Sequence, residues 1–510
     1  MAFEPKNAEL EIKYTKALAE DSIPVVMTLQ SGEGAISRVV SVSATPSVEQ
    51  IIPSTGSVQI DGKLGVKIIV ENVDGGYSCL EGANNFTIHN MNAEILPESE
   101  VFATAHSLGV NSVQASEHAV TFTTNILVKP IFLACEKVKY VSELSVAQQK
   151  RDSIFYTDIV AGTAQEFDLD IELDMPQSVS KVLCVESVAV LSKIESGNDV
   201  VSLYGEMYTN LVYLTSDEQP KLKNQRYNQS FTHELLANNI TSSDVVTATM
   251  QTSATTYELQ GELNSAKGTI LLKNLVKTNI FVRQNKSIEA VVDAFCPKYL
   301  LNNEYSSFTS QNVRKTELNF EKIDGSIVLG EDSPRIDRIL AVCSGNVITK
   351  SVDVGDKVIN ATGVLGCYVF YTLDDEEATT QSILAEVPFS LSLKKDELVP
   401  ENFVKINIVP KDIEARNKKS KEIDILAELA IESIVLQNDN DAILQNVHLG
   451  EKRPVNNSAM GLYIIPEAKD LWDVSKSLAI PGELIIQQNP DLSFPITTPQ
   501  RLIVYREKSV

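Results

Sequence analysis

Apolar and polar positions alternate with a period of two along much of the chain, which is the pattern of half-buried β-strands. β-branched and aromatic residues are concentrated in segments such as Lys63–Val70, Leu203–Leu214 and Gly363–Leu373, each of which ends near an acidic or glycine-containing turn. Helical periodicity is rare, and one helix is predicted over Ser142–Arg151, with Ser142 as its N-cap. The pattern predicts a mainly β protein built from antiparallel sheets.

A short motif occurs three times and indicates internal repeats. It consists of an aliphatic, a polar and a basic residue, followed by alternating aliphatic positions. Its copies are Ile36–Val42, Val179–Val185 and Ile336–Val342. Their separation is that of consecutive domains of ordinary size.

The residues that follow each copy keep the same order and nearly the same spacing. A glycine that enters an apolar strand comes first, then an acidic turn, a phenylalanine and a strand that contains valine. The residues are Gly62, Gly205 and Gly363; Asp74, Asp217 and Asp374; Phe86, Phe231 and Phe389; Val101, Val246 and Val404. Strand periodicity alone would not fix these offsets three times, so we expect three copies of one β-sandwich in preference to three unrelated β domains.

The repeats set the expected domain boundaries. The first repeat, with an N-terminal strand, is expected at 1–137, the second at 166–297 and the third at 326–437. Linkers are expected at 138–165 and 298–325, where polar residues accumulate. A further boundary is expected at 437–456, before a separate C-terminal module at 457–507.

The C-terminal module differs from the repeats in its pattern. We expect a strand at 462–465, a helix that starts over 470–476, a second helix at 481–488 and a strand at 501–505. Asp470 is the predicted N-cap of the first helix, and Pro481 opens the second. Leu471, Val474 and Leu478 fall on one face of the first helix.

Composition and charge exclude several functions. The 510-residue chain has a formal net charge of −24 and a sequence pI of about 4.7, so it lacks the clustered Lys and Arg that nucleic-acid binding requires. No apolar run reaches membrane-spanning length, and the N-terminal residues do not form a secretory signal. We therefore expect residence in the cytosol, with no nucleic acid and no membrane insertion.

Residues for catalysis or metal binding form no recognisable group. The five histidines occur singly, and the six cysteines include no CxxC pair. No P-loop, GxSxG or Rossmann sequence occurs. Carboxylates gather at 374–377 and 438–441, where solvated turns are favoured over a calcium site. We expect no enzyme activity, no cofactor and no metal.

The C-terminal module resembles LysM domains. Tyr463 lies nine positions before Trp472, and Asn489-Pro490-Asp491 follows the second helix. Ala468-Lys469 replaces the usual glycine-aspartate, and Pro499 stands without a glycine before the last strand; these departures count against glycan binding. Three repeats followed by such a module resemble the SPOCS-LysM family of clostridial spore coat morphogenetic proteins.

This resemblance implies three SPOCS-like domains and a structural role in the spore coat, at the forespore surface in the mother cell. It implies that the LysM-like module binds a SpoIVA-like coat morphogenetic ATPase or another coat protein, and we also expect self-association through the β domains. Two alternatives stay open: a homopolymeric filament or appendage subunit, and a peptidoglycan-binding LysM protein. The residues expected to bind the partner are Tyr463, Lys469, Asp470, Leu471, Trp472 and Asn489.

Trp472, the single tryptophan, is expected to anchor that partner surface. It is adjacent to Leu471 and so points about 100° away from it on the helix, toward the edge of the apolar face. Tryptophan is enriched among interface hot spots, so we prefer a partly exposed contact residue over a core residue.

Overall fold

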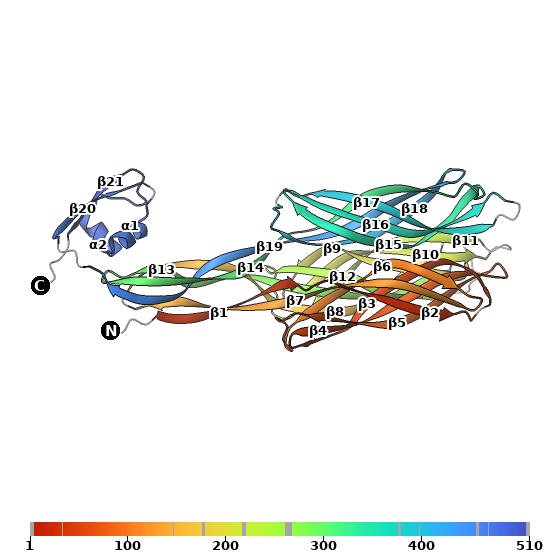
Figure 1. Cartoon of the computed structure of the whole chain (residues 1–510), viewed down its shortest axis with the longest axis horizontal. Coiled ribbons are helices and arrows are strands. Elements are labelled where there is room, and N and C mark those ends of the chain that lie inside the picture. Colours follow the sequence, from red (N-terminus) through yellow and green to blue (C-terminus); the bar gives the residue numbers. More distant parts are fainter. Residues whose placement is uncertain are drawn as a thin grey trace.

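The computed structural model describes residues 5–505 except 33, 146, 176–178, 217–220, 261–267, 376–378, 397, 455–457 and 468. The molecule is elongated (Figure 1). Three β-sandwiches lie together at one end, a narrow stalk of strands leads away from them, and the C-terminal module lies at the tip of the stalk. The predicted class is confirmed, because the fold is mainly β with antiparallel sheets and two short helices near the C-terminus.

Each repeat supplies six strands in the same order, except that the first strand of the first repeat is divided in two. The first repeat has β1 (Pro5–Ala17), β2 (Asp21–Gln30), β3 (Ile36–Ser54), β4 (Ser57–Asn72), β5 (Tyr77–Met91), β6 (Val101–Ala115) and β7 (Ala119–Leu144). The second has β8 (Gln148–Asp174), β9 (Val179–Ser196), β10 (Val200–Thr215), β11 (Leu222–Leu236), β12 (Val245–Gln260) and β13 (Thr269–Phe295). The third has β14 (Tyr299–Val328), β15 (Ile336–Gly355), β16 (Val358–Leu373), β17 (Thr380–Lys394), β18 (Phe403–Lys419) and β19 (Glu422–Lys452).

Each sandwich consists of two antiparallel sheets, and the strand order is the same in all three sandwiches. The second, third and fourth strands form a meander, in the orders β3-β4-β5, β9-β10-β11 and β15-β16-β17. In the other sheet the last strand of the repeat is central: β7 pairs with β1, β2 and β6, β13 with β8 and β12, and β19 with β14 and β18. Apolar side chains fill the space between the sheets, among them the fully buried Ile60, Leu203 and Leu365. The three repeats therefore share one sandwich fold, as expected.

The repeated glycine has the same place in all three sandwiches. Gly62, Gly205 and Gly363 lie in the central meander strand, directly opposite Phe86, Phe231 and Phe389. An added Cβ would come within 2.2, 2.5 and 2.4 Å of the Cζ atom of that phenylalanine, and within 2.6, 2.5 and 2.4 Å of a backbone oxygen on the neighbouring strand. Glycine is required because the ring lies across the strand where a side chain would begin.

The other repeated residues also take equivalent positions. Asp74 and Asp374 follow the central meander strands in corresponding turns, and Asp74 Oδ1 closes its turn by accepting a hydrogen bond from the Gly76 amide at 2.9 Å. Asp217 lies outside the described residues. The valines at 101, 246 and 404 lie near the starts of β6, β12 and β18.

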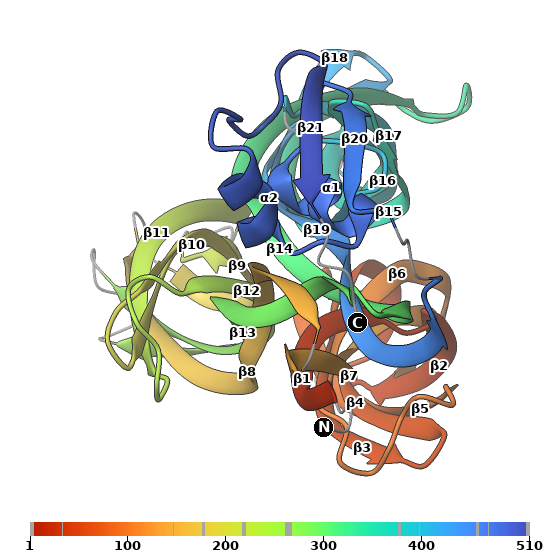
Figure 2. The same ribbon diagram turned by 90° about the vertical axis from the view of Figure 1, so that its left-hand side faces the viewer.

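The three sandwiches close into a ring around the long axis of the molecule, which Figure 2 shows end on. β9 packs against β4 and β5, β15 against β10 and β11, and β3 against β16 and β17. Ile69, Val212 and Phe370, each seven residues after its repeated glycine, are at most 1% exposed and belong to one cluster. The ring therefore has a pseudo-threefold axis within a single chain.

Side chains at the ring interfaces satisfy backbone groups of neighbouring strand edges. Lys67 Nζ donates to the Val185 carbonyl at 3.1 Å, and Asn210 Nδ2, at the equivalent position, donates to the Val342 carbonyl at 3.1 Å. Gln251 Nε2 donates to the Ala105 carbonyl at 2.5 Å. The carbonyls belong to the edge strands β9, β15 and β6, so each of these three edges receives a side-chain hydrogen bond from another repeat.

The stalk consists of three two-stranded ribbons, one from each repeat. The start of the first strand pairs with the end of the last strand: 5–17 with 131–144, 148–159 with 283–295, and 299–313 with 436–452. Apolar residues from all three ribbons fill the centre, including Ile12, Ala290 and Phe308, each at most 1% exposed. The ribbons thus share one small core, which isolated two-stranded ribbons lack.

The stalk replaces the linkers expected from the sequence. Residues 138–144 and 148–165 lie in β7 and β8, 299–325 in β14 and 437–452 in β19, so these segments are strands. The helix predicted over Ser142–Arg151 is wrong, because its described residues form the ends of β7 and β8 and the turn between them. One face of each thin ribbon meets solvent, which gives these strands the polar composition of connecting segments.

Cross-ribbon hydrogen bonds satisfy the edge strands of the stalk. The Thr15 amide donates to Gln311 Oε1 at 3.2 Å, and the Thr157 amide donates to Ser310 Oγ at 2.8 Å. These amides lie in β1 and β8, which are edge strands of their sheets. Side chains of β14 therefore accept hydrogen bonds that the carbonyls of a neighbouring strand would otherwise accept.

The C-terminal module has the expected order of strand, helix, helix and strand. The elements are β20 (Met460–Ile465), α1 (Leu471–Leu478), α2 (Gly482–Gln488) and β21 (Gln500–Tyr505). β20 and β21 pair antiparallel, with Leu462 opposite Ile503.

Replacing Gly363 by alanine should lower the free energy of unfolding by about 2–3 kcal/mol, because the new Cβ would overlap the Phe389 ring and the Ile348 carbonyl. Gly366→Ala, in the same strand, is the matched control, since its nearest neighbouring atom would be 4.0 Å away. Its effect should stay within about 0.5 kcal/mol in denaturant unfolding. Equal losses in both variants would contradict a special requirement at Gly363.

Candidate functional site

Short-range interactions fix the two helices of the module. Asp470 is the N-cap of α1, as predicted, and its Oδ1 accepts a hydrogen bond from the Asp473 amide at 2.6 Å. Ala479 ends α1 in the left-handed conformation with a φ of 53°, and Pro481 is the N-cap residue of α2. The helices pack on the sheet through a small core of Ile465, Val474, Ile480, Ile485, Ile496, Leu502 and Val504.

Trp472 lies against the tip of the stalk and is half-buried. Its Nε1 donates to Asp293 Oδ2 in β13 at 2.9 Å. Its ring is 5.2 Å from that of Phe295 in an edge-on arrangement, which aromatic pairs favour. The described contacts of this side chain are thus with the chain's own stalk.

Asp293 is the electrostatic centre of this contact. Lys476 Nζ, one turn after Trp472 on α1, lies 2.7 Å from both carboxylate oxygens of Asp293. Burial by itself would raise the pKa of Asp293, but hydrogen bonds from Lys476 and Trp472 outweigh it and lower the pKa. A second ion pair joins Lys150 in β8 to Asp470 at 3.5 Å. Charge pairs and an aromatic contact together hold the module on the stalk.

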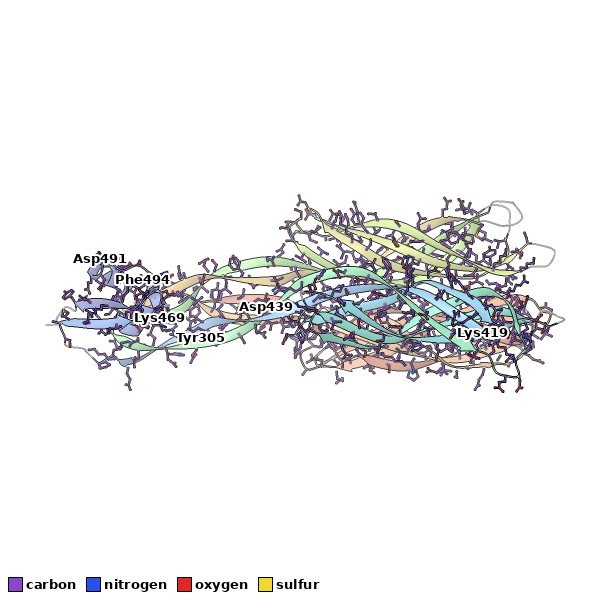
Figure 3. All side chains as sticks on the ribbon, turned by 90° about the horizontal axis from the view of Figure 1, so that it is seen from above. Tyr305, Lys419, Asp439, Lys469, Asp491 and Phe494 are labelled. Atoms are coloured by element: carbon purple, nitrogen blue, oxygen red, sulfur yellow. The ribbon has the colours of Figure 1, made fainter. Side chains whose placement is uncertain are left out.

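The other predicted partner-binding residues divide between surface and scaffold. Lys469 is exposed, and its carbonyl accepts a hydrogen bond from the Ile496 amide at 2.9 Å. Tyr463 and Leu471 pack on the module core. Asn489 clamps α2 to β21, because its side chain donates to the Ile485 and Ile503 carbonyls and accepts from the Ile503 amide. In Figure 3, Lys469 lies on the module with Asp491 and Phe494, whereas Tyr305 lies on the stalk.

The most apolar exposed surface of the module escaped the sequence prediction. Met460, Leu462 and Ile464 point away from the helices and are 57%, 60% and 74% exposed. With the exposed Ile503 and Tyr505 of β21 they form one face of the two-stranded sheet, here called the outer face. Figure 2 shows both strands turned toward the viewer, at the end of the molecule. The sequence signal is that Leu462–Ile465 is apolar at every position, so both faces of the strand are apolar.

A cavity of about 1340 Å³ lies between the three sandwiches, here called the axial cavity. The edge strands of all three repeats line it, namely β3, β6, β9, β12, β15 and β18. Its lining is mixed, with small and apolar residues such as Ala105, Met250 and Ile408 beside charged ones. Sequence reasoning did not find this cavity, because its walls come from strands that are remote in the chain.

Glu432 is the most strongly shifted carboxylate among the described residues, and it lines the axial cavity. Its Oε1 accepts a hydrogen bond from the Leu191 amide of the edge strand β9 at 2.5 Å, and its Oε2 accepts from Asn407 Nδ2 at 2.7 Å. Burial raises the pKa of Glu432 to about 7, although both hydrogen bonds act to lower it.

Comparison of the chain with protein-family models, characterised proteins and solved structures finds no match. Within the described residues, no helix is long and apolar enough to cross a membrane. In the same part of the chain, no group of three or more His, Cys, Asp and Glu side chains is placed to hold a metal ion.

Asp293→Ala should release the module from the stalk. Trp472 loses its hydrogen-bond acceptor and Lys476 its ion-pair partner, so the tryptophan becomes more exposed. Because Trp472 is the single tryptophan, its fluorescence emission should move to longer wavelength and its anisotropy should fall. Asp491→Ala, at an exposed position of the module, is the control. Unchanged emission in Asp293→Ala would show that the stalk contact does not hold the module.

Glu432→Gln should change how stability depends on pH. The pKa of Glu432 is raised from 4.5 to about 7 by folding, so its stabilising contribution is complete below about pH 4.5 and is lost as pH rises through 7. The loss amounts to roughly 3 kcal/mol, and the glutamine variant should not show it. Urea unfolding between pH 5 and 8 measures the difference, with the exposed Glu451→Gln as control. Parallel pH profiles for wild type and Glu432→Gln would contradict the assignment.

Proposed function

We propose that this chain is a non-enzymatic structural assembly protein, in which the ring and stalk hold the C-terminal module at one end and the outer face of the module binds a partner protein. The outer face carries this proposal. Large apolar side chains on that face meet solvent, although the strands carrying them already have a core on their other side. Exposed apolar patches of this kind mark protein contact surfaces.

The two surfaces of the module support different roles. The α1 surface, with Trp472 and Lys476, meets the stalk through polar and aromatic contacts. The outer face lies on the opposite side of the sheet from the helices. Its centre, with Leu462 opposite Ile503, is apolar, whereas Arg501 pairs with Ile464 at one end. An apolar centre with a charged neighbour suits a protein surface as the occupant.

The resemblance of the repeats and the module to SPOCS-LysM proteins supports a finer version of this proposal. In that version the protein belongs to the spore coat, at the forespore surface in the mother cell, and the outer face binds a SpoIVA-like coat morphogenetic ATPase. A filament or appendage subunit would use the same face on a second copy of the chain. The two versions differ in what occupies the outer face.

Ile464→Glu should weaken binding to the purified coat ATPase by roughly 30-fold, which is the loss expected at an interface hot spot. Val26→Glu, at a similarly exposed apolar position in β2, is the matched control and should bind as wild type does. Trp472→Glu should weaken binding much less than Ile464→Glu does, because that residue faces the stalk. Biolayer interferometry with the full-length proteins measures all four affinities.

Equal affinities for wild type and Ile464→Glu would remove the outer face as the docking surface. Sedimentation of the wild-type chain alone distinguishes the filament version. In that version oligomers form without any partner, and Ile464→Glu abolishes them.

A further inference from the structure

The ring contains a buried guanidinium that has no counter-charge among the described residues. Arg283, in β13 at the base of the stalk, is 1% exposed. Its Nη1 donates to Thr247 Oγ1 at 2.7 Å and its Nη2 donates to Gln311 Oε1 at 3.3 Å, and both acceptors are uncharged. Its buried Nε finds no hydrogen-bond partner in the described part of the chain. A buried charge without an opposite charge is costly, because it has lost its hydration.

A second cation approaches the same place from another repeat. Lys405, in the edge strand β18, lines the axial cavity, and its ammonium lies 5.2 Å from the centroid of the Phe281 ring. Phe281 is two residues before Arg283 in β13. Burial, assisted by the nearby positive charge of Arg283, lowers the pKa of Lys405 to about 7. The structure shows no hydrogen bond or ion pair from Lys405 to a carboxylate in the described residues.

The other repeats show that the fold does not require these charges. Strand register identifies the equivalent positions: Phe102 and Thr247 correspond to Lys405, and Leu133 and Leu436 correspond to Arg283. In the first repeat Phe102 and Leu133 pack in an apolar cluster. The same sandwich thus forms with apolar side chains at both positions, so the sandwich fold itself does not require the two cations.

We propose that the axial cavity binds a small molecule that carries an oxyanion, with its phosphate or carboxylate group on the Lys405 ammonium and Arg283 adding positive charge from β13. The anion would supply the counter-charge that both cations lack. The cavity, at about 1340 Å³, also has room for a larger ligand body. Ala103, Ala248 and Ile406, at equivalent positions on three strands, add small and apolar lining.

Equilibrium dialysis of the full chain against radiolabelled inorganic phosphate, at constant ionic strength in chloride, tests this proposal. We expect saturable binding of a single phosphate per chain. Lys405→Met should weaken the affinity by roughly tenfold or more, because it removes a charged hydrogen-bond donor. Lys405→Arg, which keeps the charge, should retain binding. Lys411→Met is the matched control, since Lys411 lies in the same strand and pairs with Glu428 at 3.0 Å.

Loss of binding in Lys405→Met, with retention in Lys405→Arg and Lys411→Met, would support the site. Competition by acetate and citrate distinguishes a carboxylate ligand from a phosphate ligand. The proposal is overturned if neither phosphate nor a carboxylate binds saturably to the wild type, or if Lys405→Met binds unchanged. If circular dichroism shows that Lys405→Met does not fold, thermal unfolding of the wild type tests the site instead. Phosphate near saturation should raise the Tm of the wild type by about 2 °C. A rise in Tm no larger than that in chloride at the same ionic strength would overturn the proposal.

Discussion

Backbone amides and carbonyls at the edge of a sheet need partners, and in this chain two edge strands from each repeat, β3 and β6, β9 and β12, and β15 and β18, line one axis. Within each repeat these two strands lie beside each other without pairing as a ladder in the described residues, so side chains have to satisfy many of their edge groups. Closure of the ring supplies some of these partners from a neighbouring repeat, as Lys67, Asn210 and Gln251 do. In the stalk, the side chains of Gln311 and Ser310 accept hydrogen bonds from edge-strand amides in the same way. These bonds, together with the apolar clusters that the repeats share, join the ring and the stalk.

The sequence predicted those features that depend on neighbouring strands. The offset from Gly62 to Phe86 reflects pairing between adjacent strands of a meander, so it is nearly the same in all three repeats and can be read from one sequence. The helix cap at Asp470 is likewise local. The stalk was missed because its strands pair across a whole repeat and expose polar faces. The contact of Trp472 with the stalk could not be predicted for the same reason, since its acceptor Asp293 is 179 residues away in the chain.

Attachment of the module to the stalk matters for any partner that it binds. A module on a flexible linker samples many orientations, and binding has to remove that freedom. Here Trp472, Lys476 and Asp470 fix the module on β8 and β13, so the outer face has one direction relative to the ring. Preorganisation of this kind favours assembly in which the direction of each subunit matters. The −24 net charge works in the same direction, because long-range repulsion disfavours contacts that lack a specific surface.

The contact between Thr15 and Gln311 has a consequence for synthesis. These residues are 296 positions apart, so the Thr15 amide in β1 gains this partner only after more than half of the chain has been made. At ribosomal rates of about 5–20 residues per second the interval is roughly 15–60 s. During that time the first ribbon is an open template for pairing with other nascent chains. This part of the stalk is therefore completed only when the third repeat has emerged.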